Sequence, residues 1–262
     1  MHAYLIAAVL LAPPPTADQE PLLPPPKQGG VYVIAHRGAH NGIPENTLAA
    51  YRKAIELGCD FVEVDLRMTK DGEIVSVHNA TVDAYTTNAK GPVKGFTLSE
   101  LKQMDIGSRV DPKWSDERIP TFREILDACQ KKIGIYVDMK QVDIEQAVRL
   151  VQEFEMERNC VWYGSPGELK QVLALSPQCR IMPDPGPETN LARLLDELNP
   201  QVVASVQKFC SEDFVKKCHA RGAIVFVDDK SPDDWERFFS WKMDGIQTDQ
   251  PEKLVEWLRQ KP

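Results

Sequence analysis

The chain has 262 residues, a formal net charge of −8 and 42% hydrophobic residues. This hydrophobic fraction is large enough for a core, so a wholly disordered protein is excluded. No block of like charge occurs, so we expect no nucleic-acid partner. No long uncharged apolar span follows residue 30, which excludes an internal transmembrane helix.

Residues 1–30 are predicted to form a signal peptide or a Pro-rich disordered segment. The apolar run 4–12 is too short to span a bilayer and is typical of a signal peptide, and a Pro-rich stretch that is not expected to pack follows it. We therefore expect export to the periplasm or the medium, without stable membrane insertion after removal of the signal. A cytoplasmic protein is the alternative, because no Lys or Arg precedes the apolar run.

From residue 31, short apolar runs alternate with amphipathic stretches, as in strands buried on both faces that are separated by helices. The expected strands are 31–35, 60–66, 133–139, 160–164, 179–182, 201–206, 223–228 and 243–249. The expected helices are 46–57, 98–104, 121–131, 143–157, 167–175, 188–198, 211–221, 231–239 and 251–260. Eight strand–helix units within 31–262 predict one (β/α)₈ barrel of the TIM type. A doubly wound sheet is the alternative, but its glycine fingerprint is not present.

Two local signals refine this outline. In the first helix, Asn46 is the expected N-cap and Gly58 the residue just past the end. Asp71-Gly72 predicts a two-residue hairpin turn, in which facing residue numbers sum to 143 and Asp65 lies opposite His78. Residues 79–119 then form an insertion that we expect to be functional and to cover one side of the pocket.

Glu63 and Asp65 stand in a strand that is expected to be buried on both faces. Burying two like charges is costly unless a cation compensates them. Asp138 ends another strand, and strand ends of a barrel point into the active-site mouth. We therefore predict that the three acids bind one divalent cation, Mg²⁺ or Ca²⁺, which both prefer oxygen ligands. Solvent-facing acids, and a surface pair of Asp138 with Lys140, are the alternatives.

Basic residues occupy the same strand ends. His36 and Arg37 end the first strand, and His78 ends the hairpin. An Arg offers a fork suited to phosphate, and Lys140 can hold an anion. Two imidazoles, two cations and three acids together predict metal-assisted phosphoryl transfer with His acid–base catalysis.

The six cysteines are expected to be small buried residues. Their spacing is not that of a zinc site, and most stand beside apolar runs. Disulfides would be the alternative in an exported protein. The cysteines are Cys59, Cys129, Cys160, Cys179, Cys210 and Cys218.

Four segments together resemble the glycerophosphodiester phosphodiesterase family: IAHRGAHNGIPENTLAAY, FVEVDLRMTKDGEIVSVHN, YVDMK and DGIQTDQP. Their order and spacing make the resemblance specific, and it runs from about residue 31 to 260. It implies a (β/α)₈ barrel with an insertion after the His-bearing hairpin. It also implies that the chain hydrolyses small glycerophosphodiesters to an alcohol and glycerol phosphate, with a bound divalent cation.

The resemblance further implies a role for each candidate site residue. His36 and His78 would be the general acid and base, Arg37 and Lys140 would bind phosphate, and Glu63, Asp65 and Asp138 would ligate the metal. Glu45 would support the site. The glycerol hydroxyl next to the ester would attack phosphorus, and water would open the resulting cyclic phosphate.

The chain departs from the family pattern at several positions. Asn79 stands where the family usually has Asp, and Asp138 where it usually has Glu. The Arg that usually follows the hairpin is absent from 83–87, and a Trp-rich strand end is replaced at 226–229 by Phe-Val-Asp-Asp. The last change lies near the expected pocket mouth, so the sequence leaves the alcohol of the substrate open.

Two other functions remain open from the sequence. A lysophospholipase D-type lipid phosphodiesterase would need an apolar patch near the pocket mouth, and the apolar residues of 79–119 are too scattered to indicate one. A catalytically dead phosphodiester-binding barrel is disfavoured, because both His, both cations and all three acids are retained. The sequence predicts no particular oligomeric state.

Overall fold

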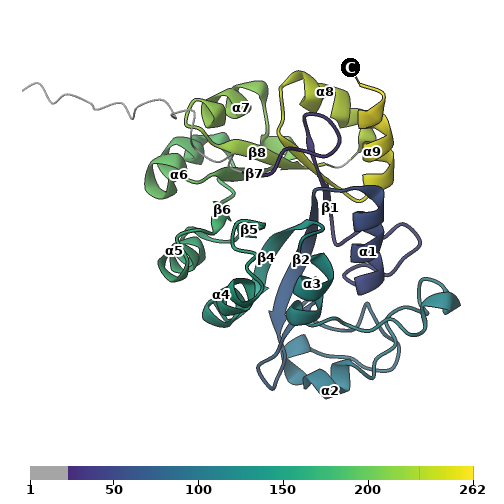
Figure 1. Cartoon of the computed structure of the whole chain (residues 1–262). Helices are drawn as coiled ribbons and strands as arrows, with labels where there is room; N and C mark the ends of the chain where they lie inside the picture. Colours follow the sequence, from purple (N-terminus) through teal and green to yellow (C-terminus); the bar gives the residue numbers. More distant parts are fainter. Residues whose placement is uncertain (1–22, 230, 262) are drawn as a thin grey trace, which may run out of the picture.

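The computed structural model describes residues 23–229 and 231–261 (Figure 1). The predicted signal-peptide run 4–12 lies outside the described residues. Within these described residues, nine strands form one sheet: β1 (Tyr32–Ala35), β2 (Phe61–Met68), β3 (Ile74–Ser76), β4 (Gly134–Gln141), β5 (Cys160–Tyr163), β6 (Arg180–Met182), β7 (Val202–Val206), β8 (Ile224–Asp228) and β9 (Gly245–Thr248).

Eight of the strands are parallel and follow the order β6-β5-β4-β2-β1-β9-β8-β7, whereas β3 pairs with β2 in the antiparallel sense. Between β6 and β7 the Ala204 N–H donates to the Pro183 carbonyl at 3.0 Å. The sheet is therefore a nearly closed barrel. This confirms the predicted (β/α)₈ fold and rejects the doubly wound alternative.

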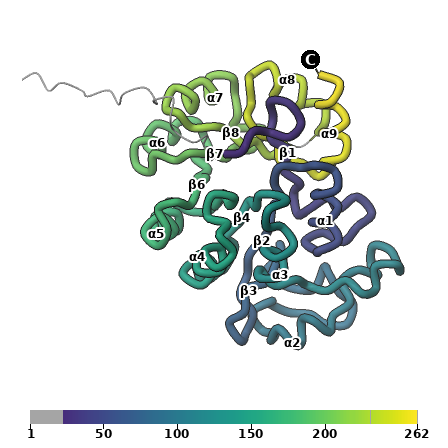
Figure 2. Tube along the Cα trace, in the orientation of Figure 1, coloured from purple at the N-terminus to yellow at the C-terminus, as the bar shows by residue number. Residues whose placement is uncertain are grey.

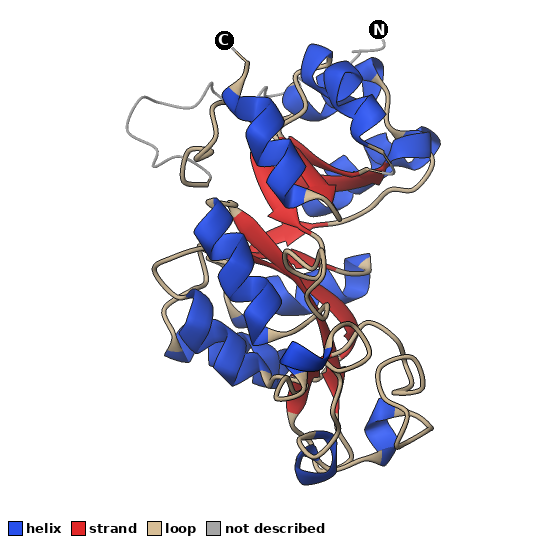
Figure 3. Ribbon diagram, turned by 90° about the vertical axis from the view of Figure 1, so that its right-hand side faces the viewer, coloured by secondary structure: helices blue, strands red, loops and turns tan. Residues whose placement is uncertain are grey.

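Helices surround the strands, as Figure 3 shows in blue and red. They are α1 (Leu48–Leu57), α2 (Leu98–Leu101), α3 (Phe122–Cys129), α4 (Ile144–Glu153), α5 (Pro166–Leu175), α6 (Leu191–Leu198), α7 (Glu212–His219), α8 (Trp235–Ser240) and α9 (Pro251–Arg259). In the described part of the chain, no helix has the length and hydropathy that crossing a membrane requires.

The alternation of side chains along β2 divides the core into two layers. Val62 and Val64 pack in the cluster between the sheet and the helices, whereas Phe61 packs inside the barrel with Phe226. Glu63 shares the inward face with Phe61, because strand side chains alternate with period two. The prediction that this strand is buried on both faces is confirmed, since residues 61–66 are all buried.

The start of α1 differs from the prediction. Thr47, and not Asn46, is the N-cap, because its side chain accepts a hydrogen bond from the Ala50 N–H at 3.2 Å. Asn46 has φ = 54°, and its side chain bonds to the side chains of Asp65 and Tyr51 instead of to a helix N–H. The predicted end of the helix is confirmed, with Gly58 in the left-handed region at φ = 79°.

The register of the hairpin is also shifted by one residue from the prediction. Leu66 pairs with Ser76 and Met68 with Ile74, so facing numbers sum to 142. The turn has three central residues, 70–72, and the Thr69 N–H donates to the Glu73 carbonyl. A three-residue turn that ends in a left-handed glycine is a common hairpin type, and it replaces the predicted two-residue turn. Asp65 and His78 are therefore not a facing pair.

Part of the Pro-rich segment packs on the barrel, contrary to the prediction. Leu23 is only 3% exposed and lies among the residues that fill the barrel interior. The Lys27 N–H donates to the Asp60 carboxylate at 2.8 Å, and the Tyr32 hydroxyl donates to the Pro24 carbonyl at 2.8 Å. Residues 23–28, dark purple in Figure 2, thus close the amino-terminal end of the barrel.

We expect the substitution Leu23→Ala to lower the free energy of unfolding by about 2–3 kcal/mol, as for other Leu side chains in a core. Denaturant unfolding measures this loss. Leu175→Ala is the matched control, because Leu175 is 41% exposed and its loss is expected to cost less than about 0.5 kcal/mol. Equal effects of the two substitutions would show that Leu23 does not close the barrel.

The insertion 79–119 has a small core of its own. It contains α2 and two short 3-10 helices, Val93–Gly95 and Pro112–Trp114. Val75 from β3 packs in a cluster with Val82, Tyr85 and Leu101 of the insertion. The insertion is therefore fixed to the hairpin that carries His78.

All six cysteines are buried, as predicted, and in the structure all six are free thiols. The outward layer of the core contains Cys59, Cys129, Cys160, Cys179, Cys210 and Cys218.

Candidate active site

The chain turns sharply at the end of β1. The His36 N–H donates to the Thr248 carbonyl at 3.1 Å, which extends the sheet by one residue. Arg37 then adopts φ = 55° and Gly38 φ = 83°. A Cβ on Gly38 would lie 2.7 Å from the Cβ of Ala50, so only glycine fits there. A positive φ at a non-glycine residue is uncommon and is concentrated at functional sites.

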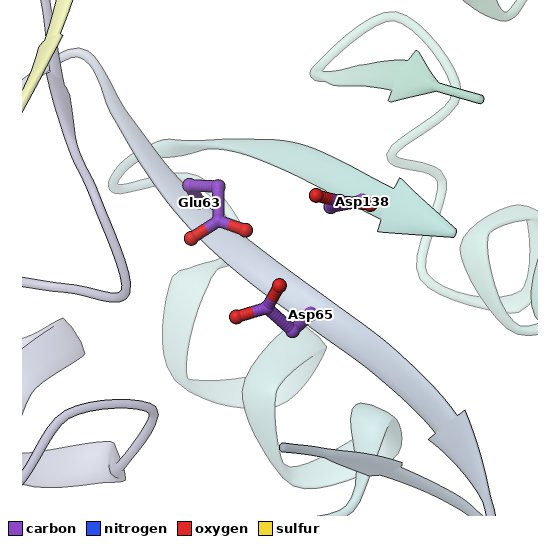
Figure 4. A group of neighbouring side chains, drawn as sticks. All are labelled: Glu63, Asp65 and Asp138. Atoms are coloured by element: carbon purple, nitrogen blue, oxygen red, sulfur yellow. The ribbon is translucent and has the colours of Figure 1, made fainter. Parts of the chain in front are cut away.

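Three buried acids converge along the middle of β2 and β4 (Figure 4). Asp65 and Asp138 are register partners in these two strands, and Glu63 precedes Asp65 on the same face. One oxygen of each side chain lies within 4.8 Å of the others. Glu63 is 2% exposed, Asp65 0% and Asp138 9%. The solvent-facing alternative for these acids is therefore wrong.

Two cations lie against the acids. The Lys140 Nζ is 2.6 Å from Asp138 Oδ2 and 3.4 Å from Asp65 Oδ1. The Arg37 N–H donates to Glu63 Oε2 at 2.8 Å, and its Nε is 4.0 Å from Asp65 Oδ2. Because two cations face three acids, the cluster keeps a formal charge of about −1 when all groups are ionised.

The residues after the β1 turn complete the surroundings of the acids. Asn46 donates from Nδ2 to Asp65 Oδ2 at 2.9 Å and accepts from the Tyr51 hydroxyl at 2.9 Å. Glu45 accepts from the Arg37 guanidinium at 3.2 Å and lies outside the group of three acids. Glu45 therefore supports Arg37. The role of Asn46 was missed in the sequence, because Asn before a helix is first of all a cap signal.

Arg37 and Lys140 compensate the charge of the three acids only in part. Burial, and then the neighbouring Asp65 and Asp138, raise the pKa of Glu63 well above its usual range. Burial also raises the pKa of Asp138, although Lys140 opposes this effect. Both shifts mean that the ionised acids are unfavourable without a further positive charge.

The cluster fits a hard divalent cation. Asp65 Oδ1 and Arg37 Nε are buried without a hydrogen-bond partner. Lys140 is near Asp65 Oδ1, but only as a charge at 3.4 Å. An unpartnered carboxylate oxygen at the centre of three acids is a free ligand position, and an all-oxygen donor set suits Mg²⁺ or Ca²⁺.

We expect Glu63→Gln to stabilise the metal-free protein by about 1–3 kcal/mol at neutral pH, because it removes a buried, repelled charge. A carboxyl whose pKa is raised in the folded state loses stability as the pH rises from the unfolded value towards the folded one. The gain should therefore shrink as the pH falls towards the ordinary pKa of Glu. Thermal unfolding in EDTA at several pH values measures it, and a variant less stable than native at neutral pH would contradict this view.

His36 is held by a carboxylate that sequence reasoning did not single out. Asp249 Oδ1 is 2.6 Å from His36 Nδ1 and 3.1 Å from His40 Nε2. These two hydrogen bonds keep the pKa of Asp249 well below its usual range. Since Nδ1 of His36 is engaged, Nε2 is the nitrogen left for proton transfer. Asp249 lies in the segment DGIQTDQP, which the sequence analysis noted. Its hydrogen bonds to His36 and His40 could not be predicted from that segment.

His78 also belongs to this site, but not through the predicted pairing with Asp65 across the hairpin. It lies beyond the end of β3, and Arg67 fixes its carbonyl with a hydrogen bond of 2.7 Å from Nη2. The Asn79 side-chain oxygen lies 3.0 Å from His78 Nδ1. A neutral amide thus orients this imidazole, where a carboxylate orients His36.

One cavity of about 270 Å³ joins these groups. None of its lining residues comes from 79–119, so the predicted cover by the insertion is wrong at this cavity. The lining residues are His36, Arg37, His78, Tyr136, Asp138, Lys140, Tyr163, Asp184, Ala204, Ser205, Val206, Phe226, Val227, Asp228 and Gln247. Five of the seven candidate residues line this cavity. The other two, Glu63 and Asp65, each have a carboxylate oxygen within 4.8 Å of one on Asp138, which does line it. The structure therefore brings all seven candidate residues together.

Known structures share this barrel. A glycerophosphodiester phosphodiesterase from Agrobacterium tumefaciens has a TM-score of 0.76 at 23% identity, over 86% of this chain and 99% of that chain. An Oleispira antarctica phosphodiesterase, determined in complex with the product sn-glycerol-3-phosphate, has a TM-score of 0.76 at 24% identity, over 87% of this chain and 96% of that one. At this identity, the likeness establishes the fold alone.

Sequence comparison goes further. A glycerophosphodiester phosphodiesterase from Caldanaerobacter subterraneus subsp. tengcongensis is 33% identical over 87% of this chain and 97% of its own length. A Bacillus subtilis relative, a putative glycerophosphodiester phosphodiesterase, is 44% identical over 49% of this chain and 55% of its own length. The model of the glycerophosphoryl diester phosphodiesterase family matches residues 36–253. The chain therefore belongs to the glycerophosphoryl diester phosphodiesterase family.

Proposed function

We propose that the chain hydrolyses glycerophosphodiesters to an alcohol and glycerol phosphate. The observation that carries this proposal is the convergence of two imidazoles, two cations and three acids on one cavity. The family membership, the names of the relatives and the product complex of the Oleispira protein support the same reaction.

Arg37 and Lys140 bind the phosphate in this proposal. Both line the cavity, and both already lie beside carboxylates that hold them in place. A guanidinium fork can bind two phosphate oxygens at once, and an ammonium adds a point charge. Together they neutralise the negative charge on the phosphoryl oxygens during transfer.

His36 and His78 transfer the protons. The glycerol hydroxyl next to the ester attacks phosphorus and gives its proton to one imidazole. The bond between phosphorus and the alcohol oxygen breaks, and the other imidazole protonates that oxygen. Water then opens the cyclic phosphate with the two roles exchanged, which restores both imidazoles to their starting states.

Glu63, Asp65 and Asp138 hold one divalent cation, Mg²⁺ or Ca²⁺. When bound, the cation supplies positive charge next to the transferred phosphate and compensates the three acids. The buried, unpartnered Asp65 Oδ1 and the raised pKa of Glu63 support this assignment.

A substrate panel tests the function. Purified protein is incubated with glycerophosphocholine, glycerophosphoethanolamine, glycerophosphoglycerol and a lysophospholipid, in Mg²⁺, Ca²⁺ or EDTA, and glycerol phosphate is measured. We expect release from the three soluble diesters in Mg²⁺ or Ca²⁺, because the cavity is small and lined largely by polar groups. Cleavage of the lysophospholipid alone would indicate a lysophospholipase D, and binding without turnover would indicate a dead barrel.

We also propose that the protein is exported. The apolar run 4–12 supports this, together with the absence of an internal apolar span. The packing of Leu23 in the barrel requires that any cleavage precede residue 23. Mass spectrometry of the secreted or periplasmic protein should find an N-terminus after Ala12 or Ala17, and an intact cytoplasmic chain would contradict export.

A further inference from the structure

His40 is a second imidazole on the carboxylate that holds His36, and the proposed reaction gives it no role. The Nε2 of His40 lies 3.1 Å from Asp249 Oδ1, the same oxygen that lies 2.6 Å from His36 Nδ1. In the described part of the chain, neither His40 nor Asp249 lines the cavity. Any effect of His40 on a substrate in the cavity therefore has to pass through Asp249 and His36.

Packing alone does not fix the carboxylate of Asp249. Its side chain is 62% exposed, although its backbone directly follows β9. Among residues 23–229 and 231–261, the hydrogen-bond partners of this side chain are the imidazoles of His36 and His40 alone. Burial raises the pKa of Asp229, and repulsion by Asp228 and Asp249 adds to this shift. An exposed carboxylate that a neighbouring acid repels turns into water unless hydrogen bonds hold it in place.

The His40 imidazole stands on a turn, residues 39–43, that distant elements anchor. The Asn41 side chain donates from Nδ2 to Glu252 Oε1 at 2.8 Å, which ties the turn to the start of α9. The Trp114 indole N–H, from the insertion 79–119, donates to a main-chain carbonyl of the turn at 2.8 Å. A donor on a fixed backbone holds an exposed carboxylate well, because little further freedom is lost when the bond forms.

The carboxylate held in this way decides which nitrogen of His36 is free. An ionised carboxylate only accepts hydrogen bonds, so His36 must carry its proton on Nδ1 and keep the lone pair of Nε2 for proton transfer. Without Asp249 in place, the neutral ring can carry the proton on Nε2, which is then no base. In an acid–imidazole pair of this kind, loss of the acid lowers turnover by about 10⁴-fold through the wrong tautomer.

We propose that His40 is a positioning residue of the reaction: it holds Asp249 Oδ1 against His36 Nδ1 and thereby fixes the tautomer of His36. His40 does not itself transfer a proton to or from the substrate. The consequence for turnover rests on the proposed function, whereas the tautomer of His36 is a property of the free protein and can be measured without substrate.

The tautomer is measured by long-range proton–nitrogen NMR of ¹⁵N-labelled, metal-free protein at a pH where the imidazoles are neutral. The His36 signals are assigned by their loss in His36→Ala. We expect the proton on Nδ1 in the native protein, and a shift to Nε2 as the major form in His40→Ala. His40→Gln should keep the native tautomer, because its amide nitrogen is the same number of bonds from the backbone as the His40 Nε2.

Asn41→Ala is the matched control, since it removes one anchor of the same turn and leaves the bond from His40 to Asp249 in place. It should keep the native tautomer of His36, because the Trp114 bond still holds the turn. A native tautomer in folded His40→Ala would overturn the proposal. An equal shift in Asn41→Ala would also overturn it, because the effect would then come from loosening of the turn.

Turnover gives the second readout. His40→Ala should lower kcat by about 10–100-fold, as for other residues that orient a catalytic imidazole, and leave KM within about twofold. His40→Gln should restore kcat to within about threefold of native, because it restores the donor to Asp249. A raised KM with unchanged kcat in His40→Ala, or no rescue by folded His40→Gln, would contradict the role of His40. The expected tautomers in a protein that cleaves no diester would instead refute the proposed function.

Discussion

Removal of divalent cations should abolish turnover, by about 10³-fold or more. The three acids lie within 4.8 Å of one another, and the pKa of Glu63 is raised by burial and by its two neighbours. Without added positive charge the cluster repels the phosphate that Arg37 and Lys140 must bind. Dialysis against EDTA, followed by release of glycerol phosphate with and without added Mg²⁺ or Ca²⁺, measures the effect.

The control for chelation is restoration of activity. Adding back one of the two cations should return turnover to the dialysed protein, and circular dichroism should show that the fold persists in EDTA. Asp65→Asn should behave like the chelated protein at every cation concentration, because Asp65 provides the unpartnered oxygen. Full turnover in excess EDTA after dialysis would show that the reaction does not depend on a bound divalent cation.

Loss of either imidazole should lower turnover by about 10²–10⁴-fold, the range for general acid–base catalysis. Both rings line the cavity, and both are oriented through Nδ1, His36 by Asp249 and His78 by Asn79. His36→Ala and His78→Ala should lower kcat far more than they raise KM. Calorimetric binding of the cation should be largely kept in both variants, since the ligands are elsewhere.

His219→Ala is the matched control for the two substitutions. His219 ends α7, contacts Asp244 and does not line the cavity, so its loss should leave kcat within about threefold of native. Near-normal kcat in folded His78→Ala would defeat its role in proton transfer. Near-normal kcat in folded His36→Ala would show that the imidazole held by Asp249 does not take part in proton transfer.

The barrel could be predicted from the sequence because its signals are local. Each buried strand is a short apolar run of its own, and helical stretches such as 143–157 show the helical period. The inward position of Glu63 and Asp65 followed from the same alternation, since a strand buried on both faces has no solvent side for them. The positions of Glu63 and Asp65 along the strand were therefore enough to predict two members of the acidic cluster.

The errors arose where tertiary contacts decide between similar local states. Asp71-Gly72 fits both a two-residue and a three-residue turn, and the Thr69 contacts selected the longer one. Asn46 and Thr47 are both good caps, and the hydrogen bond from Asn46 to Asp65 left the cap to Thr47. His78 reached the cavity despite the shifted register, because the chain leaves the sheet after β3.

Residues that act through distant partners were the hardest to find. Asp249 is 213 positions from His36, and nothing local marks it as a hydrogen-bond partner. His40 likewise is 209 positions from Asp249. Such contacts depend on how strands close the barrel, which sequence periodicity does not contain.

The most direct test of the metal-dependent reaction compares cation binding with turnover in one titration. Metal-free protein is titrated with Ca²⁺ or Mg²⁺ in a calorimeter, and glycerophosphodiester hydrolysis is measured at each cation concentration. We expect one cation per chain, turnover that rises in parallel with occupancy, and neither response in Asp65→Asn. Turnover at zero occupancy, or undiminished cation binding by Asp65→Asn, would contradict the assignment of Glu63, Asp65 and Asp138.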